Sequence, residues 1–551
     1  MANMETELFH GGGKGYGAAG ASRTKRNLKG FTAQSGSPRE DIDANNDTMR
    51  QRCRMLYMSA PVATSGIKTS RTNAIGLGLK LNPKIDAEYL GITAEDAEKW
   101  EKNTKAEFKL WAERKEACDA TGMNDFYELQ QLAFISWLVS GDVFALIKRE
   151  ETDGNKPYSL RLHMIEADRC STPQSAGTML NGMTEGETPG GNRIYDGVEI
   201  DGKGKAVAYH IRNTYPYQTV MEETEWKRVE AYGKKTGLPN IIHVMSSERP
   251  EQYRGISYLA QIIEPILQMR RYTEAEITAA IVESFFSAFV KTASDPQEMP
   301  FNEAEPVEWA EENDAQRYDP NEYEMGPGVV NVMNKGEDVE FGDPKRPASG
   351  FEPFTKAICT QIGAALEIPR DLLLKEFNSS YSASRGALLE AWKSFKMYRG
   401  WFVSDFCKPV YEVWLSEAVA RNRIKAPGFF GDRRIKEAWL GAEWIGPSQG
   451  QLDPVKEITA EIMAVENGFS TNEDSTVRYN GGDWNSNMNK LRQELEKKKE
   501  ILGETGEQRT DDSTGENRPV ASMVTGMVRK MVWKMVQETM EEEAEGEKEK
   551  E

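Results

Sequence analysis

The chain has 551 residues, of which 38% are hydrophobic and 28% are charged, and its formal net charge at pH 7 is −19. This length suits about three or four domains, and no stretch reaches the ~20 apolar residues that a membrane-spanning helix needs. Five scattered cysteines and four isolated histidines argue against a disulfide framework and a metal site, and favour a reducing compartment.

The acidic balance is itself ambiguous. A protein that grips DNA normally presents a basic face, because neutralised phosphates supply most of its affinity. An acidic chain therefore either avoids nucleic acid or handles it without holding it tightly. Charge alone leaves both interpretations open.

The first half of the chain predicts helices followed by strands. Residues 1–47 form a predicted flexible arm, rich in glycine and then in basic residues. Apolar spacing predicts helices near 47–58, 93–118 and 125–140, and residues 67–81 predict a helix that runs into a strand. Strand patterns dominate residues 142–250.

The second half is mainly helical. A helical pattern covers 256–291, and its part after Pro265 would be about 39 Å long. Residues 295–324 contain eleven acidic residues and one basic residue, Arg317. The remaining segments are predicted as follows: a hairpin at 328–343, a helix at 351–366, a polar segment at 375–384, a long helix kinked at Pro409, a mostly helical region at 426–500, a polar linker at 503–518 and a Met-rich helix at 519–551.

Motifs typical of enzymes fail on their context. Gly197, Gly202 and Lys203 match part of a phosphate-binding loop, but Gly204 stands where Ser or Thr must hold magnesium. Nuclease carboxylates usually lie beside a supporting Lys or His, and the acidic run offers only Arg317. We therefore expect no catalytic residue, no metal and no cofactor.

Several strings, in order along about 450 residues, resemble portal proteins of lambda-type tailed bacteriophages. They are NNDTMRQRCRMLYMSAPVATSGIKTSRTNAIGLGLKLNP (45–83), GDVFALI (141–147), RLHMIEADRCSTP (161–173), YRGISYLAQIIEPILQMRRYTEAEITAAI (253–281), FEPFTKAICTQIGAALEIPRDLLLKEFNSSYSASRGALLEAW (351–392) and EWIGPSQGQLDPVKEITAEIMAVENGFST (443–471). No single string is diagnostic, but their shared order makes chance resemblance improbable.

The resemblance implies an α+β portal fold that assembles into a closed ring, usually a dodecamer, at one capsid vertex. It would pass double-stranded DNA without sequence specificity, dock the terminase large subunit and the head–tail connectors, and contact the major capsid protein or scaffold. It would reside in the virion after assembly in the host cytoplasm, away from membranes. A metal-dependent nuclease, or another packaging enzyme, is the alternative.

The same resemblance divides the chain. The expected parts are an N-terminal arm (1–47), a wing (48–255), a first stem helix (256–292), a clip (293–350), a second stem helix (351–370), a channel loop (371–384), a long helix that supports the wing and crown (385–425), a crown (426–500), and a linker with an amphipathic tail (501–551).

Two groups of site residues follow. In and beside the channel loop, the candidates for contact with DNA are Lys375, Asn378, Ser379, Ser380, Tyr381 and Arg385. Lys375 and Arg385 are equally well explained as ordinary surface charges. In the clip, the candidates for partner docking are Glu303, Glu305, Glu308, Glu311 and Glu312, for which a solvated acidic face is the simpler interpretation.

The tail lies outside the resemblance. Met523, Met527, Met531 and Met535 recur every four residues beside valines, a pattern typical of an amphipathic helix with an adaptable face. Such a helix would pack on the ring itself or dock onto a partner such as scaffold, and the sequence does not choose between the two.

Overall fold

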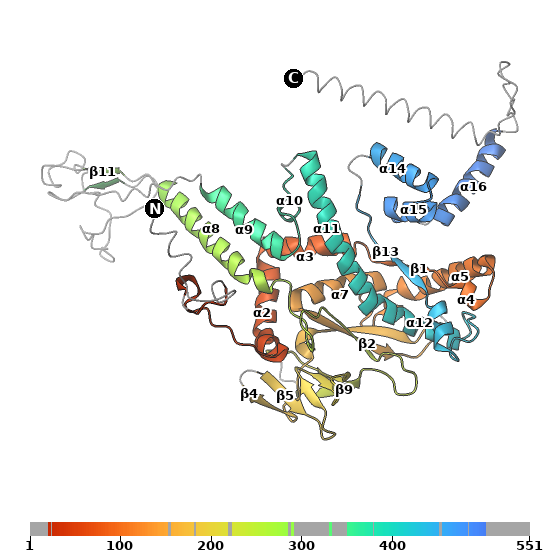
Figure 1. The fold of residues 1–551 in the computed structure, drawn as a ribbon, viewed down its shortest axis with the longest axis horizontal. Helices are drawn as coiled ribbons and strands as arrows, with labels where there is room; N and C mark the ends of the chain where they lie inside the picture. The colour runs from red at the N-terminus through yellow and green to blue at the C-terminus, as the bar shows by residue number, and fades with distance from the viewer. Residues whose placement is uncertain are drawn as a thin grey trace, which may run out of the picture. The chain divides into compact units, whose positions relative to one another are not determined.

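The computed structural model describes residues 20–23, 25–152, 156–180, 183–218, 223–284, 288–290, 330–332, 350–377, 380–450, 454–482 and 484–502. It confirms the predicted α+β class: helices cover antiparallel sheets (Figure 1). The chain divides into two units, residues 1–482 and 483–551. None of the described helices is long and apolar enough to cross a membrane.

The N-terminal part is helical, as its periodicity predicts. The helices are α2 (Ala44–Ser59), α3 (Pro61–Ala74), α4 (Ala87–Leu90), α5 (Ala94–Ala112), α6 (Lys115–Cys118) and α7 (Phe126–Ser140). Asp125 and Glu128 form a capping box at the start of α7, which satisfies two backbone N–H groups. The predicted helix 93–118 is interrupted at Arg114, whose backbone is extended, and is therefore two helices.

Two sheets make up most of the strand region. Strands β10 (Ile241–Met245), β2 (Asp142–Arg149) and β3 (Leu160–Glu166) form an antiparallel sheet in that order. A six-stranded antiparallel meander contains β4 (Gly177–Leu180), β5 (Met183–Glu187), β6 (Arg193–Tyr195), β7 (Val198–Ile200), β8 (Ala206–Arg212) and β9 (Trp226–Glu230). Asp196 and Gly197 have positive φ angles and form the two-residue turn between β6 and β7, as Asp-Gly pairs do in tight hairpins.

Helices α8 (Ile263–Ser284) and α9 (Phe351–Ala365) lie side by side and extend away from the sheets (Figure 1). The Tyr272 ring packs on Phe354 with ring centroids 4.6 Å apart. The predicted helix through residue 291 is wrong, since Ala288–Val290 form strand β11, which pairs in parallel with β12 (Val330–Val332). The described part of the predicted hairpin 328–343 is thus a strand with a different partner, and the rest lies outside the described residues.

The long helix after the channel loop consists of α11 (Tyr381–Phe402), a π-helical turn (Val403–Cys407) and α12 (Lys408–Ala420). The wider turn ends two residues before Pro409, whose missing N–H cannot continue the regular ladder, so the irregularity falls close to the predicted kink. Phe406 and Trp414 on this helix are fully buried. Phe108 packs edge-on against Trp414 with centroids 4.9 Å apart, which joins α5 to α12 in the main core.

In the last part of the first unit, residues 433–445 pack against the core, whereas the helices that follow are largely exposed. Helix α13 (Arg433–Trp439) leads into β13 (Ala442–Ile445), which pairs antiparallel with β1 (Lys80–Pro83). Helices α14 (Pro454–Glu466) and α15 (Asn472–Asn480) follow and bury no residue completely. The second unit begins with α16 (Trp484–Leu502), and its residues from 503 onward, including the predicted tail helix, lie outside the described residues.

Candidate functional site

The predicted channel-loop segment is held at both ends. Before it, α10 (Arg370–Leu374) packs on α3: the Ser65 hydroxyl donates to the Leu373 carbonyl at 2.7 Å, and the Leu373 side chain is buried. After it, the Ser380 hydroxyl accepts a hydrogen bond from the Ala383 N–H and caps α11, as a serine at this position does. The two ends of the segment are therefore fixed by contacts with α3 and α11.

The predicted DNA-contact residues fall into three groups. Asn378 and Ser379 lie outside the described residues, as do all five predicted docking glutamates, Glu303, Glu305, Glu308, Glu311 and Glu312. Ser380 serves as the helix cap, and Tyr381 is the first residue of α11. Lys375 and Arg385, the two cations, are both described with their contacts.

Each cation has a partner within the chain. The Lys375 backbone is left-handed where α10 ends, and its ammonium donates to the Thr69 hydroxyl at 2.7 Å. Partial burial lowers the pKa of Lys375 below the usual lysine value. The Arg385 guanidinium lies 3.5 Å from the Glu457 carboxylate of α14. A role for either residue at DNA stays a prediction.

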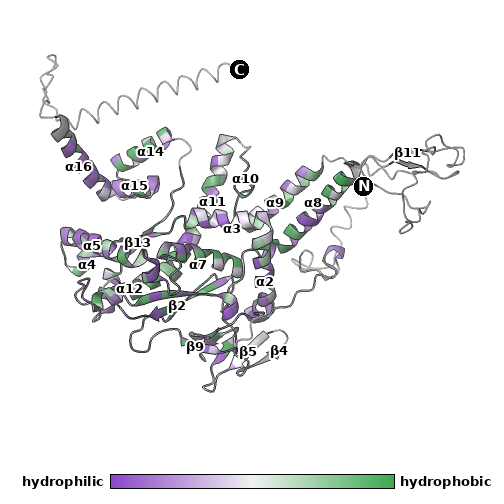
Figure 2. Cartoon of the chain, turned by 180° about the vertical axis from the view of Figure 1, so that it is seen from behind, coloured by the Kyte–Doolittle hydropathy of each residue, from purple (hydrophilic) through white to green (hydrophobic). Residues whose placement is uncertain are grey.

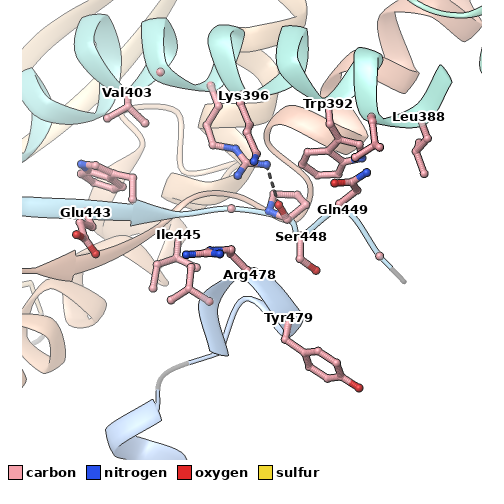
Figure 3. Close-up of a pocket in the computed structure, with 18 of the residues that line it drawn as sticks. Leu388, Trp392, Lys396, Val403, Glu443, Ile445, Ser448, Gln449, Arg478 and Tyr479 are labelled. Carbon is pink, nitrogen blue, oxygen red and sulfur yellow. Dashed lines mark hydrogen bonds between the residues drawn. The ribbon is translucent and has the colours of Figure 1, made fainter. Parts of the chain in front are cut away.

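A groove lies beside Arg385, between α11, the segment after β13, and helices α14 and α15. Its volume is about 820 Å³, and Figure 3 shows Trp392 and Lys396 of α11 on one side with Arg478 of α15 on the other. Arg399 also lines the groove, and its guanidinium donates to the carbonyls of Asn73, Ala74 and Pro447 at 2.8–2.9 Å. Burial lowers the pKa of Arg399 to about 10. This arginine thus joins α3 to the segment after β13.

The strongest electrostatic feature is a buried charge cluster centred on Arg254. Its guanidinium has no exposed surface; Nε donates to Asp142 Oδ2 at 2.6 Å and Nη1 donates to Asp196 Oδ2 at 2.7 Å. The remaining donors reach the carbonyls of Ala167 and Cys170, both at 2.9 Å. Every nitrogen of this guanidinium is therefore hydrogen-bonded, as a buried charge requires.

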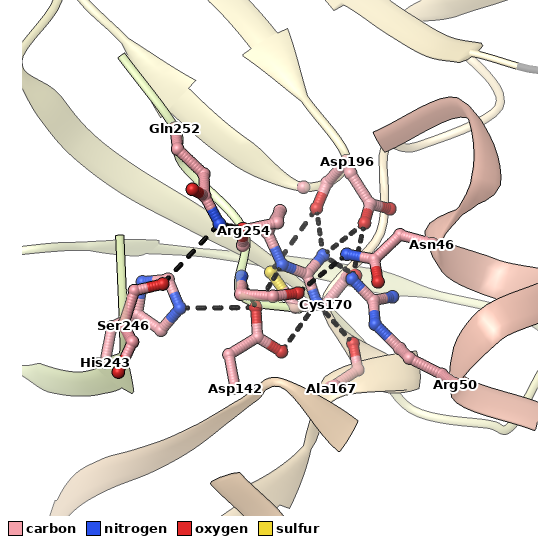
Figure 4. Close-up of polar contacts among 12 residues, drawn as sticks. Asn46, Arg50, Asp142, Ala167, Cys170, Asp196, His243, Ser246, Gln252 and Arg254 are labelled. Atoms are coloured by element: carbon pink, nitrogen blue, oxygen red, sulfur yellow. Dashed lines mark hydrogen bonds and ion pairs between the residues drawn. The ribbon is translucent and has the colours of Figure 1, made fainter. Parts of the chain in front are cut away.

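Helix α2 and strand β10 also contribute residues to the cluster. Arg50 of α2 donates to Asp196 Oδ2 at 2.9 Å, and Asn46 donates to the Gly255 carbonyl at the same distance. His243 Nε2 lies 3.4 Å from Asp142 Oδ2. Figure 4 shows these side chains converging on Arg254 from different segments. The cluster thus joins α2, both sheets and the segment that leads into α8.

Electrostatics inside the cluster follow from this geometry. Burial opposes ionisation of Asp142, but the Arg254 and Arg50 guanidiniums outweigh it and hold the pKa of that carboxyl well below its usual value. Burial lowers the pKa of His243, which keeps the imidazole neutral near pH 7. Burial, with the neighbouring Asp196 charge, raises the pKa of Asp43 to about 7. Asp43 is thus the group at the edge of the cluster whose charge changes near neutral pH.

Close backbone contact reinforces the cluster. A Cβ atom on Gly255 would lie 1.9 Å from the carbonyl oxygen of Gly141, which is far inside van der Waals contact. Gly141 itself has φ +91° and ends α7 immediately before Asp142. Only glycine at both positions lets the segment before α8 lie against the start of β2.

Sequence reasoning did not single out this cluster, although most of its residues lie in the strings that carry the resemblance; Asp196 and His243 do not. Asn46 and Arg50, Gly141 and Asp142, Ala167 and Cys170, and Arg254 and Gly255 come from four different strings. The Gly-Asp and Arg-Gly pairs and the Asp196-Gly197 turn were the available signals. None of them reveals that these segments meet.

The fold is of the α+β class, and a buried charge cluster joins its distant segments. Among the described residues, no group of three or more His, Cys, Asp or Glu side chains is placed to hold a metal ion. The sequence model of phage portal proteins, lambda family, matches residues 24–399. The chain therefore belongs to the lambda family of phage portal proteins.

Individual relatives agree with this family. The chain is 24% identical over 483 residues to portal protein B of Escherichia phage lambda, covering 84% of this chain and 85% of that protein. It is 23% identical over 480 residues to the portal protein of Escherichia phage N15, covering 84% and 86% of the two chains. Among solved structures, it is similar to a chain in the neck of a native GTA particle computed with C12 symmetry, with a TM-score of 0.36, 12% identity, and coverage of 79% of this chain and 92% of that one.

Proposed function

We propose that this chain forms a closed ring at one vertex of a phage capsid and provides the channel through which double-stranded DNA is packaged and ejected. The observation that carries the proposal is its membership of the portal family. The proposed ring is a dodecamer located in the virion, assembled in the host cytoplasm. No catalytic step is assigned to it.

The α8–α9 pair supports assembly into a ring. Leu267, Ile277 and Ile281 on α8 are 42%, 55% and 47% exposed, and Phe354 on α9 is 46% exposed. Large apolar side chains grouped on a projecting pair of helices are typical of a surface that another subunit covers. We propose that these helices are the stem and that residues 48–255 form the wing.

Charge supports a channel that lets DNA slide. Each phosphate that a protein neutralises adds a sequence-independent attraction, so a strongly basic lining would hold the duplex. The net charge of −19 per chain, multiplied around a ring, disfavours such retention. The internal partners of Lys375 and Arg385 would allow at most weak contacts with the DNA backbone.

The proposed partners occupy different parts of the chain. The acidic clip, residues 293–350 with Glu303, Glu305, Glu308, Glu311 and Glu312, would dock the terminase large subunit during packaging and the head–tail connectors afterwards. The crown, residues 426–500, would face the capsid interior, with the major capsid protein or scaffold as its neighbours. The loop 371–384 would line the channel.

Light scattering combined with negative-stain microscopy of the purified full-length chain tests the proposal. We expect a particle with a mass about twelve times the 62.0 kDa of one chain, and a ring with a central hole. A monomer or an open filament at every concentration tested would contradict it. A variant in which the loop within residues 374–384 is shortened serves as the channel control: rings should persist while packaged DNA or its retention decreases.

A further inference from the structure

The groove beside Arg385 is bounded along one side by a continuous face of α11. Its lining residues on this helix include Trp392, Lys396 and Arg399, and they continue to Val403 at the start of the π-helical turn. Figure 3 shows Trp392, Lys396 and Val403 pointing from the helix toward β13 and the segment after it. The positions from Arg385 to Val403 span about 27 Å of helix, which corresponds to about eight residues of extended chain. The groove therefore has the length of a short peptide segment.

Apolar side chains line the wall between the charged groups. Trp392 of α11 and Trp444 of β13 are only 3% and 8% exposed, so both are packed in place. The Arg399 guanidinium, held by its hydrogen bonds to three carbonyls, lies 5.8 Å from the centre of the Trp392 ring. Leu389, in contrast, lines the groove and is 46% exposed. A fixed apolar wall with one exposed leucine is suited to a large apolar side chain of an occupant.

The carboxylates of the groove already have cations of this chain beside them. Three glutamates line it, and each lies within 3.5 Å of a basic group; the pairs are Glu443 with Lys84, Glu457 with Arg385, and Glu461 with Arg478. Their negative charges are compensated locally, so they do not call for a cationic occupant. They also disfavour a strand of nucleic acid, which would bring a phosphate close to each of them.

Two positive charges of the groove have no such match. The exposed side chains of Lys396 and Lys408 line it, and within the ranges that the structure describes neither ammonium takes part in an ion pair or a hydrogen bond. Arg399 adds a third cation, which is bonded to backbone carbonyls. The charge left over in the groove is therefore positive, and it complements carboxylates.

We propose that this groove binds an acidic peptide segment of a partner protein. The segment lies extended along α11, places one large apolar side chain beside Leu389 and Trp392, and directs carboxylates toward Lys396 and Lys408. The buried apolar contact supplies affinity, and the charges at its edge select the partner and speed its association. This docking site goes beyond the proposed ring and channel, and it does not depend on them.

Binding of a synthetic peptide to the purified full-length chain tests the proposal. The probe is a fluorescent peptide in which a leucine is flanked on both sides by glutamates, and its binding is followed by fluorescence anisotropy. Lys396→Glu and Lys408→Glu reverse the two unmatched charges, whereas Lys396→Arg keeps the charge. Lys102→Glu is the matched control, since Lys102 is an exposed residue of α5 outside the groove and its replacement changes the net charge equally.

We expect the peptide Kd to rise about tenfold or more in Lys396→Glu and in Lys408→Glu, and to stay within about twofold in Lys396→Arg and Lys102→Glu. A peptide with glutamines in place of its glutamates should bind the unaltered chain about tenfold more weakly. Absence of saturable binding, or equal loss in Lys102→Glu, would overturn the proposal. So would equal or tighter binding of a single-stranded oligothymidylate of the same net charge, which would assign the groove to nucleic acid.

The assembled state provides a separate readout. If Lys396 reacted with an acylating reagent in unassembled chains but was protected in rings, a neighbouring copy would fill the groove, and the peptide site would be ruled out. Rings seen by microscopy in a chain that fails to bind the peptide would leave the proposed function intact. Peptide binding by a chain that never forms rings would contradict the proposed function and support the docking site.

Discussion

The buried Arg254 guanidinium finds all of its hydrogen-bond partners within a single chain, whereas large apolar side chains along α8 and α9 remain exposed to water. The Arg254 guanidinium is fully buried with two carboxylates and backbone carbonyls around it. Ile277 and Ile281, by contrast, are about half exposed on a helix that projects from the sheets. The comparison separates what one chain completes by folding from what we propose a neighbouring copy covers.

This difference has an energetic basis. A buried charge pair must be completed within the fold, because one unpaired charge left in the interior costs several kcal/mol. Exposed apolar side chains cost a single chain little, and they contribute about 25 cal/mol for each Å² that a neighbour later covers. Substitutions in the cluster should therefore affect folding, and substitutions on α8 should affect assembly.

Arg254→Ala should have the largest effect on folding. It removes the counter-charge of Asp142 and leaves that carboxylate buried, so we expect a loss of about 3–5 kcal/mol in the free energy of unfolding. Chemical denaturation of the unassembled chain measures this. The matched control is Arg433→Ala, whose side chain is 91% exposed and lies 3.8 Å from Glu437, and which should change stability by less than about 0.5 kcal/mol. Similar losses of unfolding free energy in the two variants would show that the cluster contributes no more to stability than an exposed ion pair does.

Local patterns predicted local structure well. The apolar spacing of α2 and α7 gave their bounds to within a few residues, because these helices are specified by contacts within one or two turns. The caps expected for α2 near residues 45–47 are wrong, since these residues lie inside the helix. The strand-rich character of 142–250 and the family itself were predicted as well. The helix predicted through residue 291 failed because pairing between β11 and β12, 42 residues apart at Ala288 and Val330, overrides local periodicity.

The cluster could not be predicted for a related reason. Arg254 and Asp142 are 112 residues apart, and Arg254 stands in a polar segment that resembles an exposed turn. Only the folded backbone, with Gly141 against Gly255, brings the two charges together. The proposed channel and clip residues are uncertain for a different reason. Their residue types suit contact with DNA or with a partner protein, but such contacts depend on molecules outside the chain.

Asp43→Asn should have a smaller effect, of opposite sign and dependent on pH. Asp43 lies at the edge of the cluster, and burial with the Asp196 charge raises its pKa from 3.8 to about 7. The folded chain therefore binds more protons than the unfolded chain between these values, and stability falls as pH rises through that window. After allowance for solvent screening, we expect Asn to stabilise the chain by about 1–2 kcal/mol at pH 8 and by nothing below pH 4.

Unfolding curves of the unaltered chain and of the Asp43→Asn variant, recorded at pH 4 and pH 8, provide the measurement. Asp47→Asn is the matched control, since Asp47 is exposed in the first turn of α2 and should give no gain at pH 8. An Asp43→Asn gain that is the same at both pH values would mean that the effect arises from helix capping or packing, and would remove Asp43 from the electrostatic account.

Ile277→Lys should have the smallest effect on folding and a large one on assembly. The Ile277 side chain is 55% exposed in the single chain, so its replacement should change the free energy of unfolding by less than about 0.5 kcal/mol. In a ring, however, a lysine would be buried against the neighbouring stem without a partner, which costs several kcal/mol at every interface. We therefore expect monomers with an unchanged unfolding curve.

Ala275→Lys, which adds the same charge on the opposite side of α8, should keep more of the chain in rings. If Ile277→Lys assembled as completely as the unaltered chain, the exposed face of α8 would not be the surface between subunits. The surface that a neighbouring subunit covers would then have to be sought on other helices or strands of the chain.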